Sequence, residues 1–247
     1  MELQRRCQLP LRLLCKIVLL ALLLWPTGSR EQLQFVIPSA SHGFAVVGSW
    51  VTCNGVEAYP GSTISCTLSQ TPTSGQAVLG VQGNGQGNWD FTSVSVGTLY
   101  NFPSTVNDLN GFIICNPSTS SATIVFTPQS IYVTYNIGMI IVSGVNCTSS
   151  PVDAGAGVST NYNPPTSTGS VTAAAAYDEV CGFVQGPAST YAAGSNFTAE
   201  SGTSLGGGQP FMECSNNMLT SGNSLNPGVS ITGGNSYTMG TVALILN

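Results

Sequence analysis

The side chains of this chain that could do chemistry are carboxylates, amides, aromatic rings and one histidine, because no lysine or arginine follows Arg30. Lysine-based covalent catalysis and a phosphate-binding P-loop are therefore excluded for residues 31–247. A nucleophilic triad would need His42 as its base. His42 lies in the small polar segment Ser39–Gly43. We interpret it as a surface or turn residue, and no catalytic residue is assigned.

Paired carboxylates are the one enzyme mechanism for which the chain has the parts. Glycoside hydrolysis needs two carboxyl groups about 5–9.5 Å apart. Asp178 and Glu179 are adjacent, and adjacent side chains of a strand point to opposite faces, so these two cannot form the pair. The fold would have to assemble a long-range pair, such as Glu57 with Glu179 or with Glu213. A glycosidase is therefore less favoured than the two non-catalytic functions considered below. Each lone carboxylate is interpreted as a loop cap or a solvated edge.

Oxygen-bearing side chains near residue 108 suggest a metal site. Asn107, Asp108 and Asn110 could supply carboxylate and amide oxygens to a calcium ion, which prefers such hard ligands. The segment lacks the full ligand spacing of an EF-hand, and an Asx-turn is the alternative use of the same groups. Calcium is the only cofactor that the sequence suggests.

An aromatic ring beside a glycine-rich loop could bind a sugar. Trp89 directly follows the loop Gly83–Asn88 and is flanked by Asn88 and Asp90. The indole could stack on a sugar ring while the neighbouring amide and carboxylate bond its hydroxyl groups. Trp50 lies within an apolar run, so we predict that it packs in the core.

Six cysteines follow the N-terminal segment, and an even number is typical of disulfides formed in an oxidising compartment. A metal site formed by these cysteines is not indicated, because there is no Cys-x-x-Cys motif and only one histidine. The sequence alone cannot choose among the pairings. We favour the local ones, which are Cys53–Cys66, Cys115–Cys147 and Cys181–Cys214.

Residues 1–29 have the pattern of a secretory signal peptide. Basic residues between Arg5 and Lys16 precede the apolar run Ile17–Trp25, and Pro26–Ser29 offers a cleavage site rich in small residues. This run of nine residues is short for a membrane span, which needs about 20. An uncleaved anchor is therefore the less favoured alternative. We predict a secreted or cell-surface protein that has no membrane contact after cleavage.

Removal of residues 1–29 would leave nine carboxylates and Arg30, a formal charge of −8. Only 6% of all residues are charged, against roughly 25% in ordinary soluble proteins. Nucleic acid is excluded as a partner, because binding it requires lysine and arginine to neutralise phosphates.

Trypsin-like proteases should find no cleavage site in the mature chain. Because no lysine or arginine follows Arg30, prolonged digestion of the reduced and unfolded chain should leave it intact beyond that residue. Mass spectrometry of the digest checks this prediction, and internal fragments would contradict it.

The elements that must position these side chains are short strands. Runs rich in Val, Ile, Thr, Tyr and Phe alternate with Gly, Pro, Asn and Ser, and no helical period is evident. We expect strands at Phe44–Cys53, Ser62–Leu68, Gln76–Gln82, Phe91–Leu99, Gly111–Cys115, Ala122–Thr127, Ser130–Tyr135, Gly138–Val145, Glu179–Gln185, Asn196–Ala199, Pro210–Cys214, Gly228–Thr232 and Tyr237–Leu246. Val152–Ser170 is expected to be a long polar connection. The pattern predicts an all-β fold, a single β-sandwich or jelly-roll-like domain over residues 31–247.

Three stretches resemble a recurrent secreted bacterial β-sandwich domain of unknown function. They are Ser62–Val81, Ile124–Val145 leading into Ser150–Ala154, and Gly169–Val184, with the motifs TPTSGQAV and SGV followed by PVD. The resemblance implies a jelly-roll-like sandwich at the cell surface, often within adhesive or polysaccharide-associated proteins. It implies no activity and no catalytic residue. The chain departs from that pattern by its six cysteines and by lacking an Asp-x-x-Gly-Asn-x-Tyr loop.

The sequence therefore favours a non-catalytic module for adhesion or carbohydrate binding, with a polysaccharide or surface glycan as its partner. The alternative is a structural protein that assembles into fibres or a surface layer. Low charge does little to oppose self-association, and the apolar segment Thr241–Leu246 could pair across a sheet edge.

Overall fold

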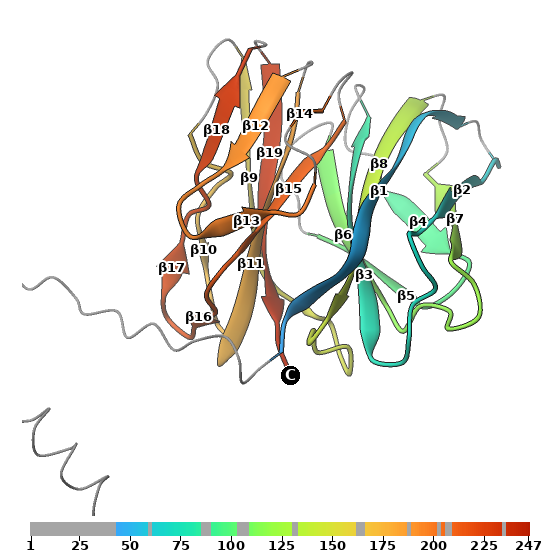
Figure 1. Cartoon of the computed structure of the whole chain (residues 1–247), viewed down its shortest axis with the longest axis horizontal. Coiled ribbons are helices and arrows are strands. Elements are labelled where there is room, and N and C mark those ends of the chain that lie inside the picture. Colours follow the sequence, from blue (N-terminus) through green and yellow to red (C-terminus); the bar gives the residue numbers. More distant parts are fainter. Residues whose placement is uncertain are drawn as a thin grey trace, which may run out of the picture. The chain divides into compact units, whose positions relative to one another are not determined.

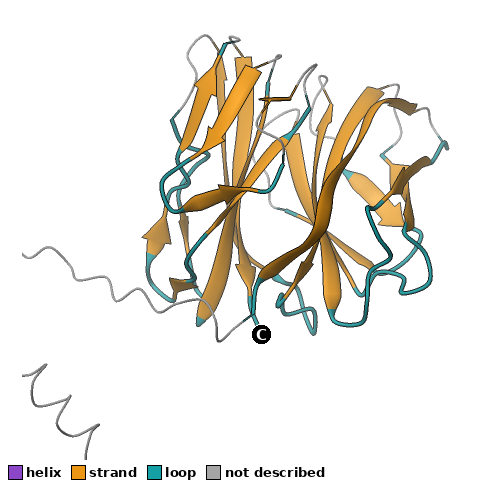
Figure 2. Cartoon of the chain, in the orientation of Figure 1, coloured by secondary structure: helices purple, strands orange, loops and turns teal. Residues whose placement is uncertain are grey.

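A computed structural model describes residues 43–247, except 59–60, 85–89, 103–108, 130–132, 162–165, 187–188, 202–203, 206–208 and 234–235. The predicted signal peptide and His42 lie outside the described residues. The described part is built of strands and contains no helix (Figure 2). The predicted all-β sandwich fold is thereby confirmed.

The strands fall into two halves of the chain. The N-terminal half contains β1 (Ala45–Ala58), β2 (Ile64–Thr67), β3 (Gln76–Asn84), β4 (Phe91–Val94), β5 (Thr98–Asn101), β6 (Leu109–Cys115), β7 (Thr123–Pro128) and β8 (Val133–Ser143). The C-terminal half contains β9 (Val152–Asn161), β10 (Val171–Thr172), β11 (Tyr177–Gln185), β12 (Ser189–Ala193), β13 (Phe197–Ala199), β14 (Ser204–Leu205), β15 (Phe211–Ser215), β16 (Leu219–Thr220), β17 (Ser224–Leu225), β18 (Val229–Thr232) and β19 (Ser236–Ile245).

The two halves repeat one topology. The large antiparallel sheet of the N-terminal half has the order β1-β8-β3-β6-β5, and that of the C-terminal half has the order β9-β19-β11-β15-β13. Short motifs recur at a spacing of 102 residues: Val78-x-Gly80 as Val180-x-Gly182, and Tyr135-x-x-Gly138 as Tyr237-x-x-Gly240. The pairing register agrees, since Gly80 faces Met139 and Gly182 faces Thr241. The chain therefore contains an internal structural repeat, with one copy in each half.

Each large sheet carries smaller sheets on its outer face, and the two large sheets pack against each other (Figure 1). The outer N-terminal sheet is β2-β7-β4; the outer C-terminal sheets are β14-β12-β18 and β10-β17. One core cluster joins the halves, with Leu79 and Ile113 on one side and Phe183 and Val242 on the other. The other clusters fill the space between each large sheet and its outer sheets. Burial of these side chains is the main stabilising contribution to the stack.

The expected strands are mostly present, the short strands β10, β12, β14, β16 and β17 were not expected, and three of the expected ranges differ from the structure. Phe91–Leu99 is two strands, because the chain turns at Gly97, which has a φ of 85°. The expected strands Ser130–Tyr135 and Gly138–Val145 form one, β8. The expected connection Val152–Ser170 is wrong in its first part, since Val152–Asn161 forms β9 along β19. Its sequence DAGAGVSTN has few β-branched residues, so pairing with β19 rather than propensity makes it a strand.

The three favoured cysteine pairs are the disulfides of the structure, Cys53–Cys66, Cys115–Cys147 and Cys181–Cys214. Cys181 and Cys214 face each other on neighbouring strands β11 and β15. Three disulfides indicate an oxidising environment for folding. Among the described residues, none belongs to a helix that is long and apolar enough to cross a membrane.

Candidate functional site

The predicted ligand and calcium residues belong to the segments that follow β3 and precede β6 in sequence. β3 and β6 are antiparallel neighbours, with Gly83 opposite Leu109. The segment after β3 and the segment before β6 therefore meet the sheet at one end. Asn88, Trp89, Asn107 and Asp108 lie outside the described residues. Asp90 and Asn110, the other two members of the predicted sets, are described.

Asp90, Asn101, Asn110 and Tyr135 form a polar cluster at this end, which we call the N-terminal polar cluster. Three members adjoin Phe91: Asp90 precedes it in sequence, the ring of Tyr135 stacks on its ring at 5.4 Å, and the Asn101 side-chain amide donates to its carbonyl at 2.9 Å. Asn110 is on the same face of β6 as Phe112, whose ring lies 5.7 Å from that of Phe91. Asn110 is 3% exposed and Tyr135 is fully buried. The cluster thus lies at the rim of the core between β2-β7-β4 and the large sheet.

Three polar atoms of this cluster have no hydrogen-bond partner among the described residues: Asn101 Oδ1, Asn110 Nδ2 and the Tyr135 hydroxyl. Burial, with a smaller contribution from the charge of Asp90, raises the pKa of Tyr135 to about 12, so its hydroxyl keeps its proton. Burial also raises the pKa of Asp90. The cluster offers one amide donor, one amide acceptor and a hydroxyl that can do both. Since an unpaired buried polar group costs about 1–3 kcal/mol, a bound hydroxyl group or water would be stabilised here.

The calcium prediction has only Asn110 within the described residues, and Asn110 is a buried member of β6. The described part of the chain gathers no group of three His, Cys, Asp or Glu side chains. The calcium site therefore stays a prediction. Trp50, by contrast, packs against the central core cluster as expected, and its ring covers Gly138, where a Cβ would lie 1.9 Å from the ring.

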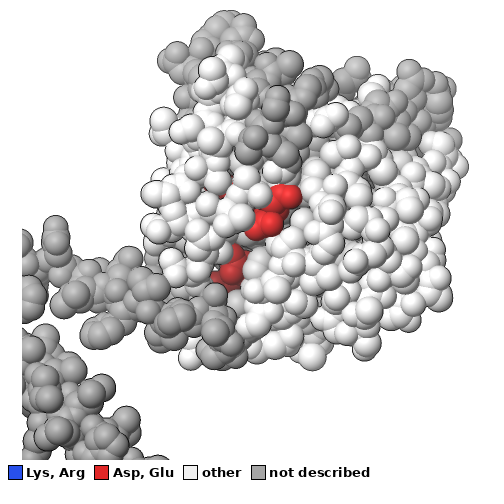
Figure 3. Space-filling model, in the orientation of Figure 1, with Lys and Arg blue, Asp and Glu red and all other residues white. Residues whose placement is uncertain are grey.

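The C-terminal half contains three buried carboxyl groups that were interpreted from the sequence as loop caps or solvated edges. Asp178, Glu179 and Glu213 are between 0 and 2% exposed, so that interpretation is wrong for them. In the view of Figure 3, acidic side chains of the described residues are visible mainly in a hollow near the centre, and the other described residues on that face are uncharged. The strand pattern around these residues is ordinary, and no sequence signal distinguished them from surface acids.

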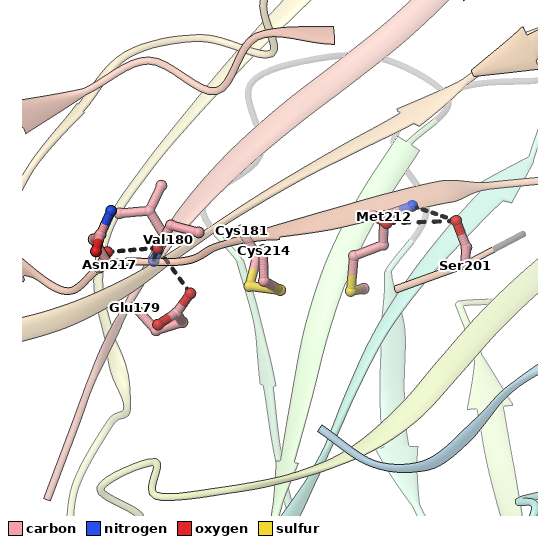
Figure 4. Close-up of a disulfide and its surroundings, with 8 residues drawn as sticks. Glu179, Val180, Cys181, Ser201, Met212, Cys214 and Asn217 are labelled. Atoms are coloured by element: carbon pink, nitrogen blue, oxygen red, sulfur yellow. Dashed lines mark hydrogen bonds between the residues drawn. A yellow bond between two sulfur atoms is a disulfide. The ribbon is translucent and has the colours of Figure 1, made fainter. Parts of the chain in front are cut away.

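Glu179 lies on the central face of β11, beside the disulfide Cys181–Cys214 (Figure 4). Its Oε1 is 2.8 Å from the Ser215 hydroxyl oxygen, which is also 2.8 Å from the Asn217 carbonyl. The Val180 amide donates to the same Ser215 oxygen at 3.4 Å. Burial raises the pKa of Glu179 to about 8, and the charge of Glu200 adds to that rise, while the hydrogen bond to Ser215 opposes it.

Asp178 lies on the opposite, outer face of β11, on the side of Val180 and its core cluster. Neither of its carboxyl oxygens has a hydrogen bond of good geometry among the described residues. Burial and the neighbouring carboxyl of Asp153 raise the pKa of Asp178 to about 7. Burial also acts to raise the pKa of Asp153, but hydrogen bonds from the Ala174 and Ala175 amides outweigh it, so the pKa of Asp153 is lowered.

Glu213 lies on the outer face of β15, opposite Gly182. The Gly194 amide donates to its Oε2 at 2.9 Å, whereas Oε1 has no partner among the described residues. Burial raises the pKa of Glu213 to about 7 despite that hydrogen bond. A Cβ on Gly182 would lie 2.7 Å from Thr168 Oγ1, 3.0 Å from Pro227 Cβ and 3.3 Å from Glu213 Oε1, so the carboxyl group is one of three groups that cover this glycine.

The repeat shows that these acids are not required by the topology. The positions of Asp178 and Glu179 in β11 are those of Gln76 and Ala77 in β3. Glu213 pairs with Gly182 as Phe112 pairs with Gly80, so the carboxyl group stands where the other half has an aromatic ring. The same sheet is therefore built once with non-ionisable side chains and once with three buried acids.

The carboxylate pairs considered for a glycosidase both include Glu57, so they stay untested, but the other acids in question lie on different faces of their sheet. Glu179 shares its face with Cys181, whereas Glu213 shares its face with Phe211 on the other side of the sheet. Asp178 and Glu179 also lie on opposite faces, as predicted. The side chain of Glu57 lies outside the described residues.

One Gly-x-Ser-x-Gly sequence, residues 202–206, is present in the chain. In hydrolases this motif forms a turn from a strand into a helix. Here Ser204 lies in the short strand β14, paired with β12, and the described residues include no helix. The motif is therefore not a nucleophile elbow.

Comparison with models of protein families, with curated proteins and with solved structures finds no match for this chain. The resemblance to secreted bacterial β-sandwich domains accordingly stays a prediction.

Proposed function

We propose that the protein is a non-catalytic, secreted or cell-surface β-sandwich module that binds a neutral carbohydrate at the N-terminal polar cluster. The observation that carries this proposal is the set of three buried polar atoms without partners, Asn101 Oδ1, Asn110 Nδ2 and the Tyr135 hydroxyl. Donors and acceptors at the rim of a packed core suit the hydroxyl groups of a sugar. Trp89, one residue from Asp90 in sequence, would add a stacking ring.

The electrostatics of the chain support a neutral partner. No lysine or arginine follows Arg30, so an anionic polymer has no counter-charge to meet. Three carboxyl groups of the C-terminal half are buried, which leaves the surface mainly to hydroxyl and amide groups. A polysaccharide or surface glycan fits that chemistry better than a charged polymer does.

Replacing Trp89 by alanine should abolish retention of the oxidised mature protein on insoluble polysaccharides. The test is a pull-down on a panel of such matrices, with calcium and with EDTA. Asn110→Leu, which removes the donor of the polar cluster, should also reduce retention. Ser74→Ala is the matched control, because Ser74 is exposed in the turn before β3, at the other end of that strand.

Unchanged binding of the Trp89 variant would eliminate the proposed site, and retention of the parent on no matrix would contradict the proposed function. Loss of retention in EDTA alone would support calcium at residues 107–110.

The self-assembly alternative was based on pairing of the apolar segment Thr241–Leu246 across a free sheet edge. Thr241–Ile245 belongs to β19, which is paired with β11 on one side and with β9 on the other. This segment is therefore a central strand and offers no free edge. Concentration-dependent light scattering would reveal assembly by another surface.

A further inference from the structure

The buried acids of the C-terminal half have no basic side chain to pair with. No lysine or arginine follows Arg30, and the single histidine is His42, outside the described residues. The charged group that acts on Glu179 is another acid, Glu200, and the one that acts on Asp178 is Asp153. Glu213 meets the Gly194 amide and no charged group among the described residues. A buried carboxylate with no opposite charge is strongly disfavoured, so the neutral form is the stable one.

The hydrogen bonding at Ser215 is better satisfied with a proton on Glu179 than without one. The Ser215 hydroxyl oxygen is 2.8 Å from both Glu179 Oε1 and the Asn217 carbonyl oxygen, but a hydroxyl group carries one hydrogen. Toward an ionised Glu179 the Ser215 hydroxyl group would donate its hydrogen, and its contact with the Asn217 carbonyl would then lack one. A protonated Glu179 can instead donate to Ser215 while Ser215 donates to Asn217, so that both contacts are hydrogen bonds. The remaining lone pair of Ser215 then accepts from the Val180 amide. Protonated Glu179 thus satisfies every group in this chain of bonds.

The lack of hydrogen-bond donors around Asp178 and Glu213 also favours the protonated form of these two side chains. Both Asp178 oxygens and Glu213 Oε1 are fully buried without a donor among the described residues. A negative charge on either side chain would be buried with too few hydrogen bonds to stabilise it. In the N-terminal half the equivalent positions hold Gln76 and Phe112, which cannot ionise.

We propose that protonated carboxyl groups hold the C-terminal half together: Asp178, Glu179 and Glu213 each keep a proton in the folded state, and rising pH loosens β11, β15 and β19 by removing it. The N-terminal half has no equivalent groups at these positions. The protein is therefore built to be most stable in an acidic setting.

The direction of the pH dependence follows from proton binding. An unfolded chain releases these protons at the ordinary carboxyl pKa of about 4, whereas the folded chain retains them up to a pKa of about 7 for Asp178 and Glu213 and about 8 for Glu179. The folded state binds more protons between these limits, so stability is greatest below about pH 4 and falls as pH rises to about 8. Ordinary acid denaturation runs in the opposite direction.

The repeat supplies an internal control for the experiment. Amide hydrogen exchange, corrected for intrinsic rates, is followed from pH 5 to pH 8.5 at three matched pairs of residues: Val78 with Val180, Gly80 with Gly182, and Tyr135 with Tyr237. Protection of the C-terminal member of each pair should fall by about tenfold or more relative to its N-terminal partner. The Tm should fall by roughly 10 °C over the same interval.

Variants with amides in place of the acids test the cause. Asp178→Asn, Glu179→Gln and Glu213→Gln together should flatten the fall of Tm with pH. Glu179→Gln alone should reduce the fall of Tm with pH in part, because it removes one of the three acids while its new amide can still donate to Ser215. Gln76→Ala, at the N-terminal position equivalent to Asp178, should shift the Tm equally at every pH.

Equal protection in both halves at pH 8.5, or a pH dependence that survives in the amide variants, would overturn the proposal. If the triple variant does not fold, the carboxyl ¹³C titration of the unmodified protein decides, since midpoints near the ordinary carboxyl value would also overturn it. Restoration of protection at pH 8.5 by added calcium would overturn it as well, by showing that these acids bind a cation rather than protons.

Discussion

Replacing Phe91 by alanine is expected to lower the free energy of unfolding by about 3–5 kcal/mol. Phe91 is 1% exposed and lies at the centre of the N-terminal aromatic core. Its ring contacts those of Phe126 at 4.4 Å, Tyr135 at 5.4 Å and Phe112 at 5.7 Å, measured between centroids. Three of its neighbours are therefore large rings, which cannot easily move to fill the space.

Chemical denaturation at pH 5 measures the loss at Phe91. Thr92→Ala is the matched control, because the adjacent side chain is exposed and donates one hydrogen bond to the Thr127 carbonyl. We expect that control to change stability by about 1 kcal/mol or less. A Phe91 variant as stable as the control would show that the aromatic cluster does not support the outer sheet.

Removing the disulfide Cys181–Cys214 by alanine at both positions is expected to cost about 3–4 kcal/mol. The bond joins residues 33 apart in sequence and ties β11 to β15. Both cysteines are buried in the cluster that joins the two large sheets, so their loss also removes packing between the halves. The measurement is denaturant unfolding of the oxidised parent and the double variant.

The disulfide Cys53–Cys66 provides the comparison. It joins residues 13 apart, and closing a shorter loop removes less entropy from the unfolded chain, so its removal should cost about 3 kcal/mol or less. A larger loss from Cys53–Cys66 than from Cys181–Cys214 would contradict this account of the central core.

The two halves illustrate how one topology can be given different chemistry. Gly80 is covered by the Phe112 ring, whereas Gly182 is covered by Thr168 and Pro227 together with the Glu213 carboxyl group. Fully buried Tyr135 and Tyr237 keep the same place in both halves. The two halves therefore share a backbone pattern, and only the C-terminal half carries ionisable side chains at these buried positions.

The residue types alone were enough to predict the all-β fold and the presence of disulfides, and pairing each cysteine with its neighbour in sequence gave the favoured connectivity, which the structure has. β-branched and aromatic residues alternating with turn formers leave few other ways to bury apolar surface, and cysteines close in sequence commonly lie on neighbouring strands or turns. The pattern also placed Trp50 in the core. These are local properties, which depend on side chains within a few residues of one another.

The strand β9, the repeat of the sheet order and the environment of the buried acids depend on the tertiary structure. Val152–Asn161 became a strand only because β19 provides a partner, and the repeat of the sheet order depends on pairings between distant segments. The hydroxyl group that is hydrogen-bonded to Glu179 belongs to Ser215, which is 36 residues away in sequence. Burial and hydrogen bonding of a carboxyl group are set by strands that meet only in the folded chain, so a lone acid in the sequence is indistinguishable from a surface acid until the sheets are assembled.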